Sequence, residues 1–401
     1  MIKVAIFGFG TVGSGVAEVL DLNHDTILTQ SGIDIETKYI LDLRDFPGSK
    51  YESKVVHDIN IILNDPEVSI CCETMGGKTF AYDYTKKALE AGKSVCTSNK
   101  ELVEAHGPEL IALAKAHNCS YLFEASVGGG IPIIRNLTQC LTADKIESIT
   151  GILNGTTNYM LTKMDREGAD YAEVLKEAQE KGYAERNPEA DVEGYDAGRK
   201  IAILASLVCG KTVSYEKLNV EGISSVSSVD FKYAAKLGKS IKLLGQCSFE
   251  GEKVMAMVSP CMIGSDHPLY MVNDVFNGIL VYGNMLGDAM FYGAGAGKLP
   301  TASAVCADVV AAAKENGKHI PCSWAEDSAD IISSKEQARM FLVRVESVHA
   351  EEAKVLFGDV EFIDLEGYPQ EKAFITAKMK EADFDDAYAK LTGVIGRIRF
   401  A

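Results

Sequence analysis

Basic residues are scarce in this chain relative to acidic ones. In 401 residues, 40 lysines and arginines stand against 57 aspartates and glutamates, a formal net charge of −17 at pH 7. The basic residues are interspersed with acids throughout, so no basic patch stands out. A nucleic-acid partner requires such a patch to neutralise phosphates. The balance therefore excludes a typical nucleic-acid-binding protein, and we interpret the charge as a contribution to solubility.

Long apolar runs and patterned cysteines are also missing. The longest strongly apolar stretch, 201–209, is too short to cross a bilayer, and no basic leader precedes the first expected strand. Ten cysteines are scattered without a C-x-x-C spacing, and internal repeats and low-complexity tracts are absent. These absences argue against a membrane protein and a disulfide-stapled secreted domain. They predict a cytoplasmic globular protein of two or three domains.

The chain opens with an apolar run, residues 2–7, followed by Gly8, Gly10 and Gly13 in a G-x-G-x-x-G spacing. Apolar residues then recur at helical spacing, which predicts a strand, a glycine turn and an amphipathic helix. There the first glycine permits a tight turn, the second lets a pyrophosphate approach the backbone, and the third permits close helix packing. A purely structural turn is the alternative, but the context favours dinucleotide binding.

A second strand is expected at 36–41, and the loop after it should lie near the adenosine ribose of a bound dinucleotide. The loop carries both Asp42 and Arg44. An acid here accepts a hydrogen bond from the 2′-hydroxyl of NAD, whereas an arginine favours the 2′-phosphate of NADP. Arg44, with Lys50 behind it, leads us to expect NADP. Asp42 keeps NAD possible, and a solvated loop arginine is the simplest alternative.

Strand and helix signals keep alternating through residues 68–96, which predicts parallel βαβ units with ligands at the carboxyl ends of the strands. Lys100 follows the strand at 93–96, at the rim where a nicotinamide would lie, although a lysine there can equally be solvated. The next two segments, 120–124 and 127–132, end the domain in a glycine-rich crossover. Its carbonyls could bind a cation, but on residue types alone a tight interdomain crossover is the simpler interpretation.

Residues 182–200 hold several carboxylates and lead into an expected helix. Asp196 and Lys200 are four residues apart, which places both on one helix face. Such a pair can supply acid/base chemistry and bind a cationic group. Taken alone, the segment is more simply a solvated acidic surface, because pairs at this spacing are common on helices.

Six segments in order change that balance: GFGTVG at 8–13, TSNK at 97–100, FEASVGGGIPI at 123–133, GILNGTTNYM at 151–160, GYAERNPEADVEGYDAGRK at 182–200 and GAGAGKLPTASAVCADVV at 293–310. Together they resemble the homoserine dehydrogenase family. The resemblance implies an α/β fold. A Rossmann-like dinucleotide-binding domain, 1–132, would be completed by a helix returning at 300–320, around a mixed α+β substrate-binding and dimerisation domain, 133–299.

The resemblance also implies an activity: reversible reduction of aspartate 4-semialdehyde to homoserine by NADPH or NADH, towards threonine and methionine, in a homodimer or homotetramer. Because hydride transfer places negative charge on the aldehyde oxygen, a proton donor is needed within hydrogen-bond reach. Lys200 matches the family's catalytic lysine, with Asp196 beside it, and Lys100 matches a lysine that lies between nicotinamide and substrate. The substrate-binding positions carried over are Glu185, Asp191, Asp196, Gly155 and Thr156.

The cofactor positions implied by the resemblance fall on four segments. They are Phe9, Gly10, Thr11, Val12 and Gly13 for the phosphates, Arg44 for a 2′-phosphate, Thr97, Ser98 and Lys100 near the nicotinamide, and Gly295 and Gly297 on the returning segment. In relatives a monovalent cation, usually sodium, is held mostly by backbone oxygens. The matching residues are Glu124, Val127, Gly129 and Ile131.

Residues 338–401 are expected to form a separate small module. Strands at 340–345 and 373–378 alternate with helical runs and resemble the ferredoxin-like regulatory ACT domain of longer relatives. The glycine-bearing loop and full helix that should follow the first strand are replaced by 348–356. We therefore expect a degenerate ACT-like module with a structural or dimer-forming role rather than an amino-acid-binding one.

Two other interpretations of the chain stay open. The same chemistry could act on another amino-acid-derived carbonyl or imine, in which case aspartate semialdehyde would turn over no better than its analogues. The chain could also bind a cofactor without catalysing a reaction. The joint presence of Lys100, Glu185, Asp196 and Lys200 argues against the second interpretation.

Overall fold

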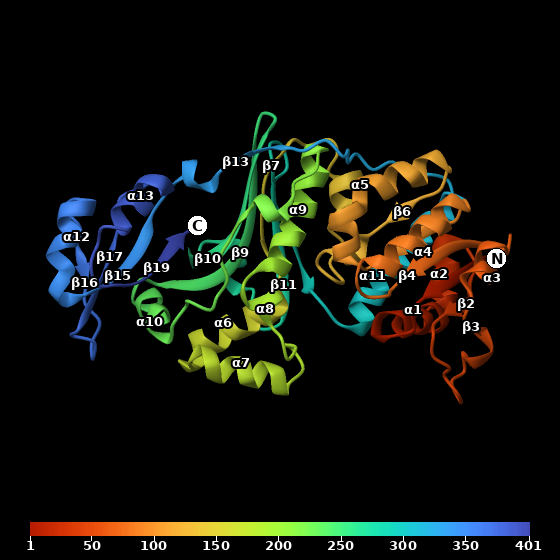
Figure 1. Cartoon of the computed structure of the whole chain (residues 1–401), viewed down its shortest axis with the longest axis horizontal. Helices are drawn as coiled ribbons and strands as arrows, with labels where there is room; N and C mark the ends of the chain where they lie inside the picture. The colour runs from red at the N-terminus through yellow and green to blue at the C-terminus, as the bar shows by residue number, and fades with distance from the viewer. The chain divides into compact units, whose positions relative to one another are not determined.

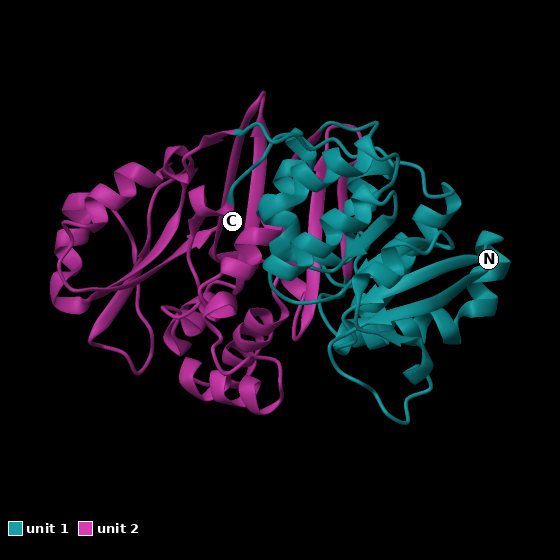
Figure 2. Ribbon diagram, turned by 45° about the vertical axis from the view of Figure 1, so that its right-hand side comes forward, with its two compact units in different colours: residues 1–145, 202–214, 293–329 teal, residues 146–201, 215–292, 330–401 magenta.

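The computed structural model describes residues 1–401 and divides them into two compact units. Unit 1 contains residues 1–145, 202–214 and 293–329, and unit 2 contains residues 146–201, 215–292 and 330–401 (Figure 2). The chain therefore returns to unit 1 twice. None of the helices combines the length and apolar character needed to span a bilayer.

Unit 1 is built on a parallel sheet of six strands in the order β3-β2-β1-β4-β5-β6. The order reverses its direction at β1, which is the switch point where ligands bind in open sheets of this kind. Its strands are β1 (Ile2–Phe7), β2 (Ile35–Leu41), β3 (Val55–Val56), β4 (Val68–Glu73), β5 (Ser94–Thr97) and β6 (Tyr121–Leu122). The Rossmann-like sheet inferred from the alternating signals is confirmed.

Helices cover the sheet of unit 1 through apolar faces. Val16 and Leu20 of the first helix and Val305 and Val309 of the returning helix are buried in one core with sheet residues such as Ile6. The helix expected to return at 300–320 is present as α11. The helices of unit 1 are α1 (Thr11–Leu22), α2 (His24–Ser31), α3 (Ile59–Leu63), α4 (Thr79–Glu90), α5 (Lys100–Ala116) and α11 (Lys298–Lys314).

Unit 2 is organised around a larger mixed sheet. Its path is β12-β11-β7-β9-β10-β19-β15-β17-β16, with β8 and β13 paired to β10. The long hairpin of β9 and β10, drawn in green in Figure 1, forms its centre. The strands are β7 (Ile146–Ile152), β8 (Asn219–Val220), β9 (Lys239–Glu250), β10 (Lys253–Gly264), β11 (Phe276–Gly283), β12 (Gly287–Ala294), β13 (Asp330–Ile332), β15 (Phe341–Glu346), β16 (Phe362–Ile363), β17 (Glu371–Ile375) and β19 (Val394–Phe400). Two short strands, β14 (Ala338–Arg339) and β18 (Met379–Lys380), pair separately.

The helices of unit 2 include the one predicted to carry Asp196 and Lys200. That helix is α9 (Tyr195–Cys209), and its part from residue 202 onward belongs to unit 1. The apolar run 201–209 is therefore the buried half of an ordinary helix. The remaining helices are α6 (Gly155–Glu167), α7 (Tyr171–Glu180), α8 (Glu189–Val192), α10 (Ser228–Lys236), α12 (Ala350–Phe357) and α13 (Glu381–Tyr388).

The C-terminal residues fold as β15-α12-β16-β17-α13-β19 with an antiparallel strand order β19-β15-β17-β16. A short helix, α12, does follow β15, where the sequence indicated that the full helix was replaced. The module has its own apolar core around Phe341, Phe374 and Phe384. Its sheet is not separate, because β19 pairs in parallel with β10 and joins the module to the main sheet of unit 2.

Candidate active site

The glycine loop after β1 has the geometry that the spacing predicts. Gly8 has a φ of +86°, and a Cβ on Gly13 would lie 2.0 Å from the carbonyl oxygen of Gly8. Neither position therefore tolerates a side chain. Gly10, by contrast, has open space where a Cβ would be and precedes the first turn of α1, which begins with Thr11 and Val12. The loop thus leaves the N-terminal amides of α1 approachable by an anion such as a pyrophosphate.

Asp42 and Arg44, the two candidates for ribose recognition, bind each other. Arg44 donates from Nε and Nη2 to the two carboxylate oxygens of Asp42, both at 2.9 Å. The backbone N–H of Phe9 donates to Asp42 Oδ2 at 2.7 Å, which ties the pair to the glycine loop. The Arg44 hydrogen bond and that of the Phe9 amide outweigh burial and hold the pKa of Asp42 well below its usual range. Asp42 is therefore a firmly ionised carboxylate at the end of β2.

The returning segment reaches the crossover inside unit 1. A Cβ on Gly129, which has a φ of +55°, would lie 2.5 Å from the carbonyl carbon of Gly295. Gly297 directly precedes α11, and a Cβ on Gly15 of α1 would lie 3.0 Å from Ala302 of α11. The glycines are needed because two backbones and two helices approach closely here. The structure thus brings the predicted segments 8–13, 127–131 and 295–297 into one unit.

The carboxyl ends of β1, β4 and β5 meet at one edge of the unit 1 sheet. There Glu73, fully buried, accepts a hydrogen bond from Thr97 Oγ1 at 2.5 Å and one from the backbone N–H of Met75 at 2.8 Å. Asn99 caps α5, whose first residue is Lys100, by accepting from the N–H of Leu102. Thr97, Ser98 and Lys100 therefore lie on the edge where a nicotinamide was expected, above a buried carboxyl group that the sequence analysis did not select.

Glu73 predicts a pH dependence of stability. Burial raises its pKa from 4.5 to about 7, against the lowering effect of Thr97 and the Met75 amide. Between these values the folded chain holds a proton that the unfolded chain has lost. Stability therefore falls as pH rises through this window, by an amount of the order of 3 kcal/mol. Glu73→Gln should remove this slope, measured as the free energy of urea unfolding between pH 5 and pH 8.

The Gln oxygen can still accept from the Met75 amide, but its NH₂ group replaces the oxygen that accepts from Thr97, a cost of about 1 kcal/mol that does not change with pH. Glu73→Gln should therefore be slightly less stable than the parent at pH 5 and more stable at pH 8. The exposed Glu90→Gln serves as the control and should follow the parent. A stability difference between Glu73→Gln and the parent that stays constant from pH 5 to 8 would contradict the assignment.

The second group of residues lies in unit 2, and Asn154 connects its members. The Asn154 side-chain amide donates to Asp191 Oδ1 at 2.7 Å and to Asp196 Oδ2 at 2.8 Å. Its own oxygen accepts from the N–H of Thr157 and so caps α6. One asparagine therefore fixes two carboxylates from different helices against the N-terminus of a third.

Lys200 completes this group. Its ammonium donates to Asp196 Oδ2 at 2.7 Å and to the carbonyl oxygen of Leu153 at 2.7 Å. The Lys200 and Asp196 side chains are only 10% and 4% exposed, so the pair is buried and not the solvated surface pair of the simpler interpretation. A buried ammonium held by a carboxylate and a carbonyl has a fixed position from which it can donate a proton.

The remaining predicted substrate residues lie at the start of α6 and on the loop before α8. A Cβ on Gly155 would lie 2.7 Å from the carbonyl oxygen of Val275, so only glycine fits. The Thr156 hydroxyl donates to the Tyr183 carbonyl at 2.7 Å and thereby ties the 181–188 loop to α6. Glu185 is on that loop with an exposed side chain.

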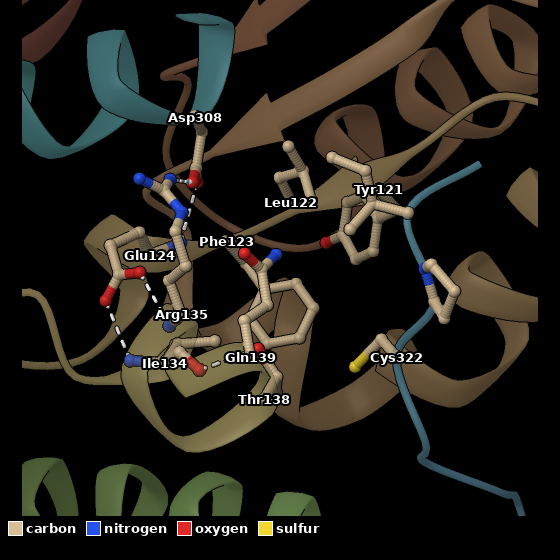
Figure 3. Close-up of a pocket in the computed structure, with 12 residues that line it drawn as sticks. Tyr121, Leu122, Phe123, Glu124, Ile134, Arg135, Thr138, Gln139, Asp308 and Cys322 are labelled. Carbon is tan, nitrogen blue, oxygen red and sulfur yellow. Dashed lines mark hydrogen bonds and ion pairs between the residues drawn. The ribbon is translucent and has the colours of Figure 1, made fainter. Parts of the chain in front are cut away.

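Glu124, expected among the cation positions, forms side-chain hydrogen bonds with backbone N–H groups (Figure 3). Its carboxylate accepts from the N–H groups of Ile134 and Arg135 at 2.7 and 2.8 Å. Its own N–H donates to Asp308, which also pairs with the Arg135 guanidinium. This cluster lines a cavity of about 30 Å³. The Glu124 side chain therefore holds the backbone of the crossover in place.

No group of three or more histidine, cysteine, aspartate or glutamate side chains is placed to hold a metal ion. All ten cysteines are free, and seven are buried. Any cation at the crossover would therefore depend on backbone carbonyls, such as those of Val127, Gly129 and Ile131.

Sequence reasoning missed Asn154 and Glu73. Asn154 had a local signal, because asparagine before Gly155 and Thr156 at the start of a helix is a typical N-cap. That signal predicts the cap but not the two carboxylates. Glu73 had no signal beyond an acid at the end of an apolar strand, because its burial depends on the neighbouring strands.

Comparisons with known proteins match two successive parts of the chain. A family model described as homoserine dehydrogenase matches residues 132–310, and one described as its NAD binding domain matches residues 8–124. The homoserine dehydrogenase of Bacillus subtilis strain 168 is 42% identical over 320 residues, 78% of this chain and 73% of the relative.

Solved structures are similar over a larger part of the chain. A homoserine dehydrogenase from Thiobacillus denitrificans has a TM-score of 0.88 at 33% identity, covering 100% of this chain and 98% of that one. A hyperthermophilic archaeal homoserine dehydrogenase in complex with NADPH has a TM-score of 0.68 at 28% identity, covering 80% of this chain and 99% of that one.

Proposed function

The chain belongs to the homoserine dehydrogenase family and is an NAD(P)-dependent oxidoreductase; from this premise we propose the residues that carry its reaction. The reaction is the reversible reduction of L-aspartate 4-semialdehyde to L-homoserine, on the way to threonine and methionine. The observation that carries the proposal is the network of buried Asn154, Asp196 and Lys200 with the half-buried Asp191. It holds a cation and two carboxylates together in fixed positions.

Lys200 is the proposed general acid and base. The nicotinamide, when bound, supplies or accepts the hydride. In the reducing direction the aldehyde oxygen gains negative charge, which the Lys200 ammonium stabilises before it transfers a proton. Asp196 and the Leu153 carbonyl orient that ammonium. Lys100, at the carboxyl edge of the unit 1 sheet, is proposed to assist this proton transfer.

The amino-acid end of the substrate needs partners of both charges. Asp191, Asp196 and Glu185 are the proposed partners of its α-ammonium group, since carboxylates form charge-assisted hydrogen bonds with ammonium. Gly155 and Thr156 open the thirteen-residue helix α6, whose first N–H groups suit an α-carboxylate. The Thr156 hydroxyl, which holds the Tyr183 carbonyl, is proposed to position the Glu185 loop.

The cofactor is proposed to bind unit 1 as the glycine geometry indicates. Residues 9–13 take the pyrophosphate, Thr97 and Ser98 lie by the nicotinamide, and Gly295 and Gly297 line the returning segment. Arg44 is the proposed partner of the NADP 2′-phosphate. Its present pairing with Asp42 means that NADP must compete with that carboxylate, so NAD use is also expected.

The experiment that tests the function follows absorbance at the reduced-nicotinamide band, with homoserine and either NADP or NAD at alkaline pH. Reduction of either cofactor supports the proposal and ranks the two. No reduction with either would contradict it and direct the work to other amino-acid-derived substrates. Sodium or potassium is added in parallel, because we propose a monovalent cation, preferably sodium, on the carbonyls of Val127, Gly129 and Ile131, with Glu124 shaping their loop.

A homodimer through β11 and β12 is also proposed. β12 is the edge strand of the unit 2 sheet, and Met290 and Tyr292 on one of its faces are 39% and 54% exposed. Phe276 of β11 stacks on Tyr292, so the apolar surface is continuous. An exposed apolar face beside an unpaired edge is typical of a subunit interface.

Met290→Lys is therefore expected to convert the dimer to a monomer, because a charge would be buried without a partner in the interface. Sedimentation velocity measures the change. Leu28→Lys, at a leucine of unit 1 that is likewise 39% exposed, is the control and should leave the dimer intact. If the parent sediments as a monomer, or if both variants keep the dimer, this interface is wrong.

Two further proposals concern the module and the compartment. The strand order of residues 338–401 supports a degenerate, ACT-like ferredoxin fold with a structural role. The ten free cysteines support a reducing cytoplasm, since thiols persist there.

A further inference from the structure

The C-terminal module holds a loop of the substrate unit through one carboxylate. Arg399 of β19, 1% exposed, donates to both oxygens of Glu221 at 2.5 and 2.8 Å. Arg397 of the same strand adds a bond to Glu221 Oε1 at 2.8 Å. Burial raises the pKa of Glu221, but the two arginines outweigh it and bring that pKa to about 2. Glu221 is therefore a permanent anion held by two cations of the module.

The segment that carries Glu221 is pressed against the turn between α8 and α9. A Cβ on Gly222 would lie 2.1 Å from the carbonyl oxygen of Val192, and Ile223 donates its N–H to that same oxygen at 2.7 Å. Val220 packs on Gly194, whose φ is +81°, at 3.2 Å from an ideal Cβ position. The contacts of Gly222 and Ile223 are to the backbone of the turn, and the Val220 side chain lies directly on Gly194, so a shift of 220–223 must shift the turn.

That turn joins the two helices that carry Asp191, Asp196 and Lys200, the charged members of the proposed substrate network. Asp191 lies in α8 directly before Val192, and Asp196 lies two residues after Gly194, in the first turn of α9. Val220 also faces Gly198, between Asp196 and Lys200, at 3.3 Å from an ideal Cβ position. The contacts therefore run from Arg399 through Glu221 to the helices that carry all three charged groups.

We propose that Glu221, held by Arg397 and Arg399, is a positioning residue for the substrate network of Asp191, Asp196 and Lys200. The inference rests on the proposed roles of those three residues. The C-terminal module then acts on catalysis mechanically, by fixing the 220–223 segment, and needs no bound effector to do so. A displacement of reacting groups by about 1 Å can cost about 100-fold in rate.

The same module provides a matched comparison. Arg344 of β15, also buried, donates to both oxygens of Glu371 at 3.1 and 2.8 Å and to Asp230 at 3.0 Å. Both arginines are buried and each binds two carboxylates, but the Glu371 side chain is 6% exposed and that of Glu221 33%. It leads to α10 through Asp230 and not to the α8–α9 turn. A variant at either site therefore loses a carboxylate that pairs with a buried arginine. Only the Glu221 site also contacts the turn between α8 and α9.

The test compares Glu221→Gln with Glu371→Gln in the full chain. We expect Glu221→Gln to lower kcat/KM for homoserine by about 10- to 100-fold, through both kcat and KM, while the dissociation constant for NADH stays within about twofold. Glu371→Gln removes the more buried carboxylate, so it should lower the thermal midpoint at least as much as Glu221→Gln and still keep kcat/KM within about threefold of the parent. Glu221→Asp, which keeps the charge, should recover part of the loss.

Three results would overturn the inference: an unchanged kcat/KM in Glu221→Gln, equal losses in both variants, or a loss of NADH binding that accounts for the change. If Glu221→Gln does not fold, Arg397→Met removes only the peripheral bond to Glu221, and it should give a smaller loss of the same kind. An unchanged kcat/KM there would count against the inference too. Turnover by the parent chain is measured first, so failure of the proposed function is seen separately.

Discussion

Lys200→Met is expected to lower the turnover of homoserine by roughly 10³-fold, because it removes the group that carries the proton. NADH binding should persist, since the residues proposed for it lie in unit 1. The substitution also leaves the buried Asp196 without its cation, so a loss of stability of about 3–5 kcal/mol is expected as well. Turnover is measured by nicotinamide absorbance, and NADH binding by fluorescence.

Lys200→Arg separates the charge from the proton. An arginine restores the cation beside Asp196 and should recover much of the stability, but it does not release a proton at ordinary pH. Its turnover should therefore remain low. Lys163→Met serves as the control, because Lys163 forms a similar i,i+4 pair with Glu167 on the surface of α6 and should be dispensable. Full activity in Lys200→Arg would mean that the charge alone suffices and that the proton comes from elsewhere.

Arg44→Ala is expected to reduce kcat/KM for NADPH by about 10- to 100-fold and to leave the value for NADH within about twofold. The guanidinium would supply charge-assisted hydrogen bonds to the 2′-phosphate, worth about 1.5–3 kcal/mol, and NADH has no such group. Steady-state kinetics with aspartate 4-semialdehyde and each reduced cofactor measures the two effects. Equal losses for both would remove Arg44 from this role.

Asp42→Asn is the reciprocal variant. It frees Arg44 from its carboxylate partner and removes a negative charge that would face the 2′-phosphate, so NADPH use should rise several-fold. The Asn oxygen can still accept from the Phe9 amide, which preserves the loop. NADH use should fall, because a neutral amide is a weaker acceptor for the 2′-hydroxyl. Lys87→Ala is the control, since Lys87 is paired with Asp83 on α4 and should leave the cofactor ratio unchanged.

The spacing of residues along the sequence was sufficient to predict the helices and strands discussed here and several of the site residues. The strand, glycine turn and helix at 2–22 follow from backbone rules that act within a few residues. The shared face of Asp196 and Lys200 follows from the helical repeat alone. The family and its reaction were also readable from six short segments, because their order along the chain is itself informative.

The hydrogen-bond partners of these side chains could not be predicted from the sequence. Arg44 was predicted to face a phosphate, and the structure pairs it with Asp42. Glu124 was predicted to be a cation position, and its carboxylate holds the amides of Ile134 and Arg135. In both cases the residue type allows two partners with similar chemistry. The distances in the folded chain show one of the two partners, and the phosphate and cation roles stay proposals.

The sequence by itself determined which residues form the strands, the helices and the candidate chemistry, because those depend on contacts between near neighbours. The tertiary structure alone decided that Asn154 joins two carboxylates, that Glu73 is buried, and that Arg399 holds Glu221 across 178 residues of sequence. The physical reason is that burial and charge pairing depend on distance and local dielectric. Both are set by segments that the chain brings together only on folding.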